Sequence, residues 1–157
     1  MFNACGFQLN RNRLQLPNGA TSIHLYKIAN NSYIPRLDFD LKDKLIEKLI
    51  QNSIDIRLTE EADMILSFTL ESLTTKKSEY SLDDSAQTYE YLFNVRGRLS
   101  VFDNRTQLFY LNNFSVGSSY SIKTEDTDLS SFDEEDGRSR VLDSLSDVIA
   151  NKLTDSF

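Results

Sequence analysis

The stretch Thr88–Phe102, TYEYLFNVRGRLSVF, alternates between apolar and polar side chains over almost its whole length. Its odd positions are apolar apart from Gly97, and its even positions from 88 to 100 are polar apart from Leu92. A period of two places the two sets on opposite faces of a β-strand. The sequence therefore predicts one unusually long strand with a single apolar face.

The segment that follows is predicted to be the antiparallel partner of this strand. Asp103–Thr106 is short and rich in residues that favour turns. Beyond it, residues of one parity are again mostly apolar, namely Leu108, Tyr110, Phe114, Val116, Tyr120 and Ile122. We expect a long hairpin whose apolar face must be covered by other elements.

Two further segments place apolar residues at helical spacing. The first begins near Asp38, a suitable N-cap, and ends near Asn52. The second begins at Ser131, which forms a capping-box pattern with Glu134, and ends near Leu153. The apolar positions are Leu41, Leu45, Ile46, Leu49 and Ile50 in the first helix, and Val141, Leu142, Leu145, Val148, Ile149 and Leu153 in the second.

The rest of the chain supplies shorter strands and a polar connection. Thr21–Ala29 and Asp63–Leu73 alternate as strands do, and Ile54–Leu58 alternates over a short span. Thr74–Ala86 is polar and is expected to form an exposed hairpin loop or flared strand ends. The predicted fold is α+β: a long twisted mixed or antiparallel sheet of about four strands, with two amphipathic helices packed on one face in the order β-α-β-β-β-α.

Composition limits the possible functions. The 157 residues carry a net charge of −7, which argues against a general nucleic-acid binder but leaves room for a local basic patch. One cysteine excludes an internal disulfide, and no apolar run reaches the length of a membrane span. We expect one domain over residues 1–157.

Catalytic and metal-binding patterns are missing from the sequence. The single histidine, His24, has no second histidine or nearby cysteine to complete a zinc site or a catalytic triad. The five glycines form no phosphate-binding loop. We therefore expect no enzyme activity, no cofactor and no metal.

Several short motifs, taken in order, resemble those of the LptE family, the lipopolysaccharide-assembly lipoproteins of Gram-negative outer membranes. They are Ala4-Cys5-Gly6-Phe7, Asn31–Pro35 and Glu61–Leu66, followed by the tyrosine-rich strand pair and the C-terminal amphipathic helix. The resemblance covers nearly the whole chain. It departs from the family at Asn52, where a glycine is common, and at Asn3, before the small residue that precedes the cysteine.

The resemblance implies a function that the composition does not. Family members are lipidated on the N-terminal cysteine, here Cys5, and residues 1–15 would then form the lipid-anchor tether on the periplasmic face of the outer membrane. They sit inside the β-barrel LptD, help it assemble, and bind and help deliver lipopolysaccharide. Two acyl groups give stable anchoring where one does not.

The resemblance also implies basic lipopolysaccharide contacts. A basic residue in the turn of the long hairpin contributes in the family, and Arg105 occupies that turn here. A second family lysine aligns near Phe132, so Lys123 is the nearest basic substitute. Further candidates are Arg96 and Arg98 on the hairpin, and Lys76 and Lys77 towards the other end of the sheet. The alternative for Arg96 and Arg98 is a solvated sheet face, and the alternative for Arg105 is an ordinary polar turn.

A different function stays open from the sequence. Similar strand–helix layouts occur in periplasmic lipoproteins that activate an envelope enzyme or pilot another outer-membrane complex. Copurification with an LptD-like barrel would separate this alternative from the LptE assignment.

Overall fold

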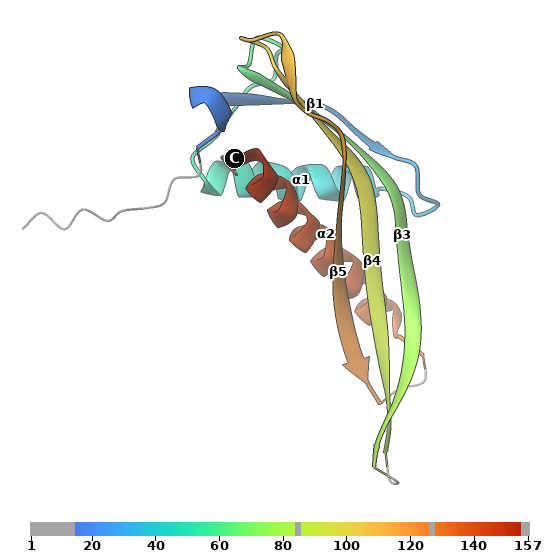
Figure 1. Cartoon of the computed structure of the whole chain (residues 1–157). Helices are drawn as coiled ribbons and strands as arrows, with labels where there is room; N and C mark the ends of the chain where they lie inside the picture. Colours follow the sequence, from blue (N-terminus) through green and yellow to red (C-terminus); the bar gives the residue numbers. More distant parts are fainter. Residues whose placement is uncertain (1–14, 84–85, 126–127, 155–157) are drawn as a thin grey trace, which may run out of the picture.

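The computed structural model describes residues 15–83, 86–125 and 128–154. Figure 1 shows one long, curved sheet with both helices on its concave side. The strands follow the order β2-β1-β3-β4-β5. This arrangement confirms the predicted α+β class, with the short β2 as a fifth strand.

The chain runs from a 3₁₀ turn, Pro17–Gly19, through an alternation of strands and helices. The elements are β1 (Ser22–Asn30), α1 (Leu37–Gln51), β2 (Asp55–Ile56), β3 (Met64–Asp83), β4 (Ala86–Asp103), β5 (Leu108–Thr124) and α2 (Ser131–Thr154). β1 pairs in parallel with β2 and β3, whereas β3, β4 and β5 form an antiparallel meander. The sheet is therefore mixed, as predicted.

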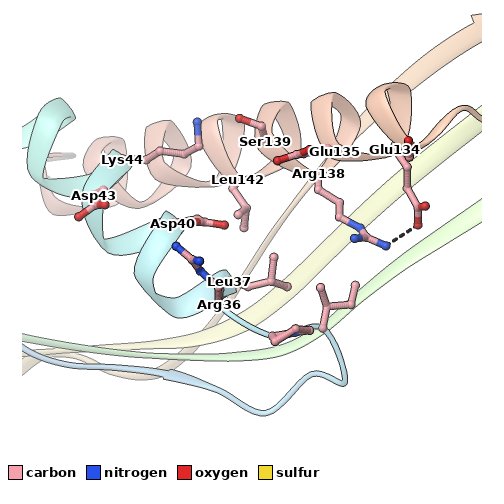
Figure 2. A pocket seen from close by; sticks show the side chains of 13 residues that line it. Arg36, Leu37, Asp40, Asp43, Lys44, Glu134, Glu135, Arg138, Ser139 and Leu142 are labelled. Carbon is pink, nitrogen blue, oxygen red and sulfur yellow. Dashed lines mark hydrogen bonds and ion pairs between the residues drawn. The ribbon is translucent and has the colours of Figure 1, made fainter.

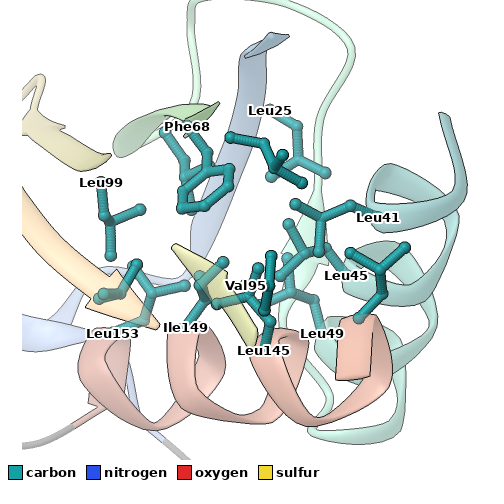
Figure 3. Packing of buried hydrophobic residues seen from close by; sticks show 14 of the residues in the cluster. Leu25, Leu41, Leu45, Leu49, Phe68, Val95, Leu99, Leu145, Ile149 and Leu153 are labelled. Atoms are coloured by element: carbon teal, nitrogen blue, oxygen red, sulfur yellow. The ribbon is translucent and has the colours of Figure 1, made fainter. Parts of the chain in front are cut away.

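The core lies between the concave face of the sheet and the two helices. The odd positions of β4 point into it, and Val95 and Leu99 are almost wholly inaccessible. Figure 3 shows leucines of both helices packed against Phe68 and Val95. Burial of each such side chain stabilises the folded state by roughly 1.5–3 kcal/mol. Packing against the helices therefore holds the long strands in one layer.

Two glycines allow aromatic rings of the core to touch the backbone. A Cβ at Gly97 would lie 2.3 Å from Cζ of Phe68 and 2.6 Å from the carbonyl oxygen of Thr69. A Cβ at Gly137, in α2, would lie 2.3 Å from Cε2 of Phe93. These two positions set how closely β3 approaches β4 and how closely α2 approaches the sheet.

The polar segment Thr74–Ala86 was expected to form an exposed hairpin loop or flared strand ends, and the structure has long strand ends there instead of a long loop. β3 continues to Asp83 and pairs with β4 over the whole stretch. The pairing sets Thr75 opposite Phe93 and Lys77 opposite Tyr91, so aromatic residues of β4 supply the cross-strand contacts that a polar strand lacks on its own.

The predicted helix caps are displaced, although α2 begins at Ser131 as predicted. α1 has Arg36 as its N-cap, in the left-handed region with φ 69°, and Asp38 lies in the first turn without capping it. α2 is capped by Ser130, whose Oγ accepts a hydrogen bond from the N–H of Asp133 at 3.1 Å. Ile50 was placed on the buried stripe of α1 but is 61% exposed, because it lies beside that stripe at the last turn.

The parity predicted for β5 does not hold along its whole length. Residues 112–113 are inserted between two register blocks, and Asn113 has φ 51°. This insertion reverses which parity faces the core, and a second register shift at Tyr110 restores it, so only residues 110–113 depart from the predicted pattern. Leu108 therefore lies opposite the buried Asp103 but is 67% exposed because it is the first residue of β5, at the end of the sheet, while Val116 is buried as expected.

Candidate functional site

The convex face of the sheet, which we call the outer face, is the candidate site. Both helices pack on the opposite face, and nothing in the described part of the chain covers this one. The even positions of β4 project from it, and Arg96 and Arg98 are exposed there. The alternation that predicted one apolar face thus also predicted this polar one.

Four of the six basic candidates share the outer face, and we call them the basic strip: Lys76, Arg96, Arg98 and Lys123. Lys76 lies opposite Leu92 on β4, and Lys123 lies opposite Glu90. Residues directly opposite in an antiparallel pair share a face, so β3, β4 and β5 each contribute to the strip.

The basic strip keeps a positive balance on a chain that is acidic as a whole. Its acidic neighbours are Glu90 and Glu71, whose Oε1 lies 3.1 Å from Nε of Arg98. Arg96 has no ion pair with any described residue. Arg96 and Arg98 are two residues apart, which is about 7 Å along β4. Lys76 lies opposite Leu92, four residues before Arg96, and is therefore about 13 Å from Arg96 along the strand direction. This spacing suits a ligand with several separated anionic groups.

One end of the outer face is apolar. Tyr26, Ile65, Phe102 and Phe109 line a shallow hollow of about 240 Å³. The rings of Phe102 and Phe109 meet edge to face with centroids 5.3 Å apart, and Phe109 is 56% exposed. The outer face therefore combines an apolar end with a charged strip. Alternating patterns could not reveal this end, since its residues come from four strands.

Arg105 lies at the end of the sheet, away from the basic strip. Its guanidinium contacts the carboxylate of Asp103 at 3.4 Å and donates to the carbonyl oxygen of Asn18 at 3.2 Å. The buried Asp103 carboxylate also accepts hydrogen bonds from the backbone N–H groups of Arg105, at 3.0 Å, and of Thr106, at 3.3 Å. Arg105 thus fastens the β4–β5 turn to the segment that precedes β1, with its side chain 36% exposed.

Two carboxylates around this turn have shifted pKa values. Burial raises the pKa of Asp103, but hydrogen bonds from Arg105, Asn18 and Thr106 outweigh it and leave the pKa below its usual value. The backbone N–H of Thr21 is the largest influence on Asp63 and lowers its pKa, with smaller help from the Arg105 charge. Both groups are therefore held as carboxylates. No local pattern in the sequence indicates these two shifted carboxylates, because the network joins residues far apart in the chain.

The remaining candidates lie elsewhere. Lys77 lies on the concave side of the hairpin, with Nζ 4.4 Å from the centroid of the Tyr89 ring. Cys5 is outside the described residues. His24 is half-buried on β1, with Nδ1 2.9 Å from the carbonyl oxygen of Arg57.

A second pocket, a cleft of about 730 Å³, lies between the first turns of α1 and the first half of α2. Figure 2 shows charges of both signs around it, including the ion pair between Arg138 and Glu134. Asp40, Asp43 and Glu135 also line it. Because four acidic residues outnumber three basic ones around it, this cleft favours an anion less than the basic strip does.

Among the described residues, no cluster of three or more His, Cys, Asp or Glu side chains is placed to hold a metal ion. Over the same residues, neither helix is long and apolar enough to cross a membrane.

Solved structures share this fold at low sequence identity. A hypothetical protein from Chlamydia trachomatis superimposes with a TM-score of 0.54 at 9% identity, covering 85% of this chain and 98% of that one. A minor lipoprotein from Acinetobacter baumannii gives a TM-score of 0.51 at 12% identity, covering 86% and 91%. A PelC dodecamer from Paraburkholderia phytofirmans gives 0.50 at 17% identity, covering 87% and 90%. At such identities the likeness establishes the fold alone.

Sequence comparison establishes the family. A search of curated proteins gave no match. The family model LptE, described as lipopolysaccharide-assembly, matches residues 20–156, which is nearly the whole chain. The family resemblance is thereby confirmed over these residues, which do not include the motif around Cys5, and the chain belongs to the LptE family of lipopolysaccharide-assembly proteins.

Proposed function

We propose that this protein is a non-enzymatic outer-membrane lipoprotein that occupies and helps assemble an LptD-like β-barrel and assists delivery of lipopolysaccharide to the outer leaflet. The observation that carries the proposal is the family match over residues 20–156. In this proposal, lipid on Cys5 holds the chain at the periplasmic face of the outer membrane.

The outer face supports a role in lipopolysaccharide contact. Lipopolysaccharide is amphipathic, with several phosphates and sugars beside acyl chains, and the outer face carries a basic strip beside an apolar hollow. Guanidinium groups bind phosphate through two parallel hydrogen bonds. Arg96 has no competing ion pair among the described residues, so it is the strongest candidate for a phosphate contact.

Arg105 is proposed as a separate and weaker contact. Its guanidinium already binds Asp103 and Asn18, so a phosphate would have to share it. Lys77 faces the ring of Tyr89 on the other side of the sheet and is a still poorer candidate. We therefore rank the basic strip above both.

The test is binding of purified lipopolysaccharide to the full-length chain and to Arg96→Glu and Lys123→Glu. Each reversal changes the local charge by two, and we expect each to weaken binding roughly fivefold or more at moderate salt. Lys42→Glu is the matched control, because it makes the same charge change on an exposed position of α1, on the opposite side of the sheet.

If Lys42→Glu weakens binding as much as Arg96→Glu, total charge rather than the basic strip governs binding, and the proposed contact is wrong. If neither strip variant changes binding while both keep the wild-type melting temperature, the outer face does not meet lipopolysaccharide.

A further inference from the structure

The outer edge of β5 is open over a long, uncharged stretch. β5 is the last strand of the sheet, and no strand in the described part of the chain pairs with its far side. Residues 114–122, FSVGSSYSI, contain no charged residue and no proline. In a strand, every second residue directs its N–H and C=O groups to the far side, so this edge presents a row of unused hydrogen-bonding groups.

α2 does not close this edge. It packs beneath the concave side of β5, where the Oγ atoms of Ser118 and Ser144 lie 2.6 Å apart and Val116 is buried. The residues of the other parity, Ser115, Gly117, Ser119 and Ser121, are all exposed. Within residues 15–83, 86–125 and 128–154, no other segment hydrogen-bonds to the main chain of residues 114–122 from the open side.

Open edges of this kind are normally protected. Proteins shorten them, add lysine or proline, or twist them away with bulges, because a long flat edge recruits other strands. Here the bulge at Asn113 protects only one end, and Lys123 follows the other. The nine residues between them span about 30 Å, enough to pair with a complete strand.

We propose that the edge of β5 over residues 114–122 receives an extended segment of the outer-membrane partner, which adds a sixth strand to the sheet. This inference rests on the proposed function for the existence of that partner. The wall of a closed barrel has no free edge, so the segment comes from a loop or another part outside the barrel wall. Main-chain hydrogen bonds supply the attachment.

Charge favours a partner segment over a second copy of this chain. Two copies joined antiparallel at this edge would place both helix layers on the same side, and α2 has six acidic residues against three basic ones. The same pairing would bring the basic strips of two copies together. A neutral or acidic strand avoids both repulsions, and acidic side chains on it would share the sheet with Arg96 and Arg98 of β4, with β5 between them.

The test uses proline at two neighbouring positions of the full-length lipidated chain. Ser118 and Ser119 direct their N–H groups to opposite sides of β5. One of the variants Ser118→Pro and Ser119→Pro therefore breaks pairing with β4 and unfolds at lower temperature, whereas the other removes an N–H group only from the open edge. We expect the variant with near-wild-type melting to capture the barrel partner from detergent extracts roughly tenfold less well.

Asn94→Lys is the matched control. Asn94 lies opposite Ser119 on β4 and shares its outer face, but it has no open edge. The Asn94→Lys variant should capture the partner as the wild type does.

Equal capture by the well-folded proline variant overturns the edge inference and leaves the proposed function intact. If only Asn94→Lys loses capture of the partner, the partner docks on the outer face, and this result also overturns the edge inference. A wild-type chain that captures no barrel refutes the proposed function itself, and dimerisation abolished by the edge proline identifies a second copy as the occupant.

Discussion

Replacing Gly137 with alanine should destabilise the protein, although alanine is the better helix former. Gly137 lies inside α2, so the substitution gains about 1 kcal/mol of helix propensity. Against this gain, the new Cβ would sit 2.3 Å from Cε2 and 2.4 Å from Cζ of Phe93. Phe93 is completely buried, so its ring cannot move without disturbing the packing around it.

The size of the effect follows from these opposing terms. Overpacking a core typically costs 1–3 kcal/mol, and the 2.3 Å approach to a fully buried ring places this substitution in the upper half of that range. After the gain of about 1 kcal/mol in helix propensity is subtracted, we expect a net loss of about 1–2 kcal/mol in the free energy of unfolding. For a domain of this size, that loss lowers the melting temperature by roughly 3–6 °C. Thermal unfolding followed by circular dichroism measures it.

The double variant makes the reasoning refutable. Phe93→Leu removes the ring that the new methyl group would meet, at a cost of its own through the cavity it leaves. In that background Gly137→Ala should be neutral or stabilising by up to about 1 kcal/mol, because only helix propensity remains. An equal loss in both backgrounds, or a stabilised Gly137→Ala in the wild type, would show that the contact with Phe93 does not set the position of α2.

Three other predictions follow from the same geometry. Gly97→Ala should be more damaging than Gly137→Ala, since its Cβ would also meet a backbone oxygen, and urea unfolding should show a loss of roughly 2–4 kcal/mol. The folded-state pKa values of Asp63 and Asp103 are lowered, so their stabilisation is fully present above about pH 4 and is lost as pH falls through the folded pKa values; Asp103→Asn should flatten this acid limb of melting temperature against pH. Phe109→Ser should leave the melting temperature within about 2 °C but lower the fluorescence of a bound hydrophobic dye, because the ring is 56% exposed.

Local patterns in the sequence were sufficient where the backbone is regular. The alternation of Thr88–Phe102 predicted β4 and both of its faces, and helical spacing predicted the stripe from Val141 to Leu153. The pattern failed within β5 only at residues 110–113, because two register shifts reverse the parity and then restore it, and no residue type marks such insertions. It left Thr74–Ala86 open between a hairpin loop and strand ends, because the partner strand, rather than local propensity, makes that segment extended.

The candidate site was predictable only in part. Arg96 and Arg98 share a parity on one strand, so their common face followed from the sequence. Lys76 and Lys123 join them through the register of three strands, which composition and periodicity do not determine. The attachment of Arg105 to Asp103 and Asn18 depends on two turns that meet across the sheet end, and it became visible only in three dimensions.

The most direct test of the central claim is to isolate the full-length lipidated protein from detergent-solubilised outer membranes and to identify its partners and their ratio by mass spectrometry. The proposed function predicts an LptD-like barrel in stoichiometric amount. A murein synthase or a secretin in place of that barrel would contradict the proposed role in lipopolysaccharide assembly.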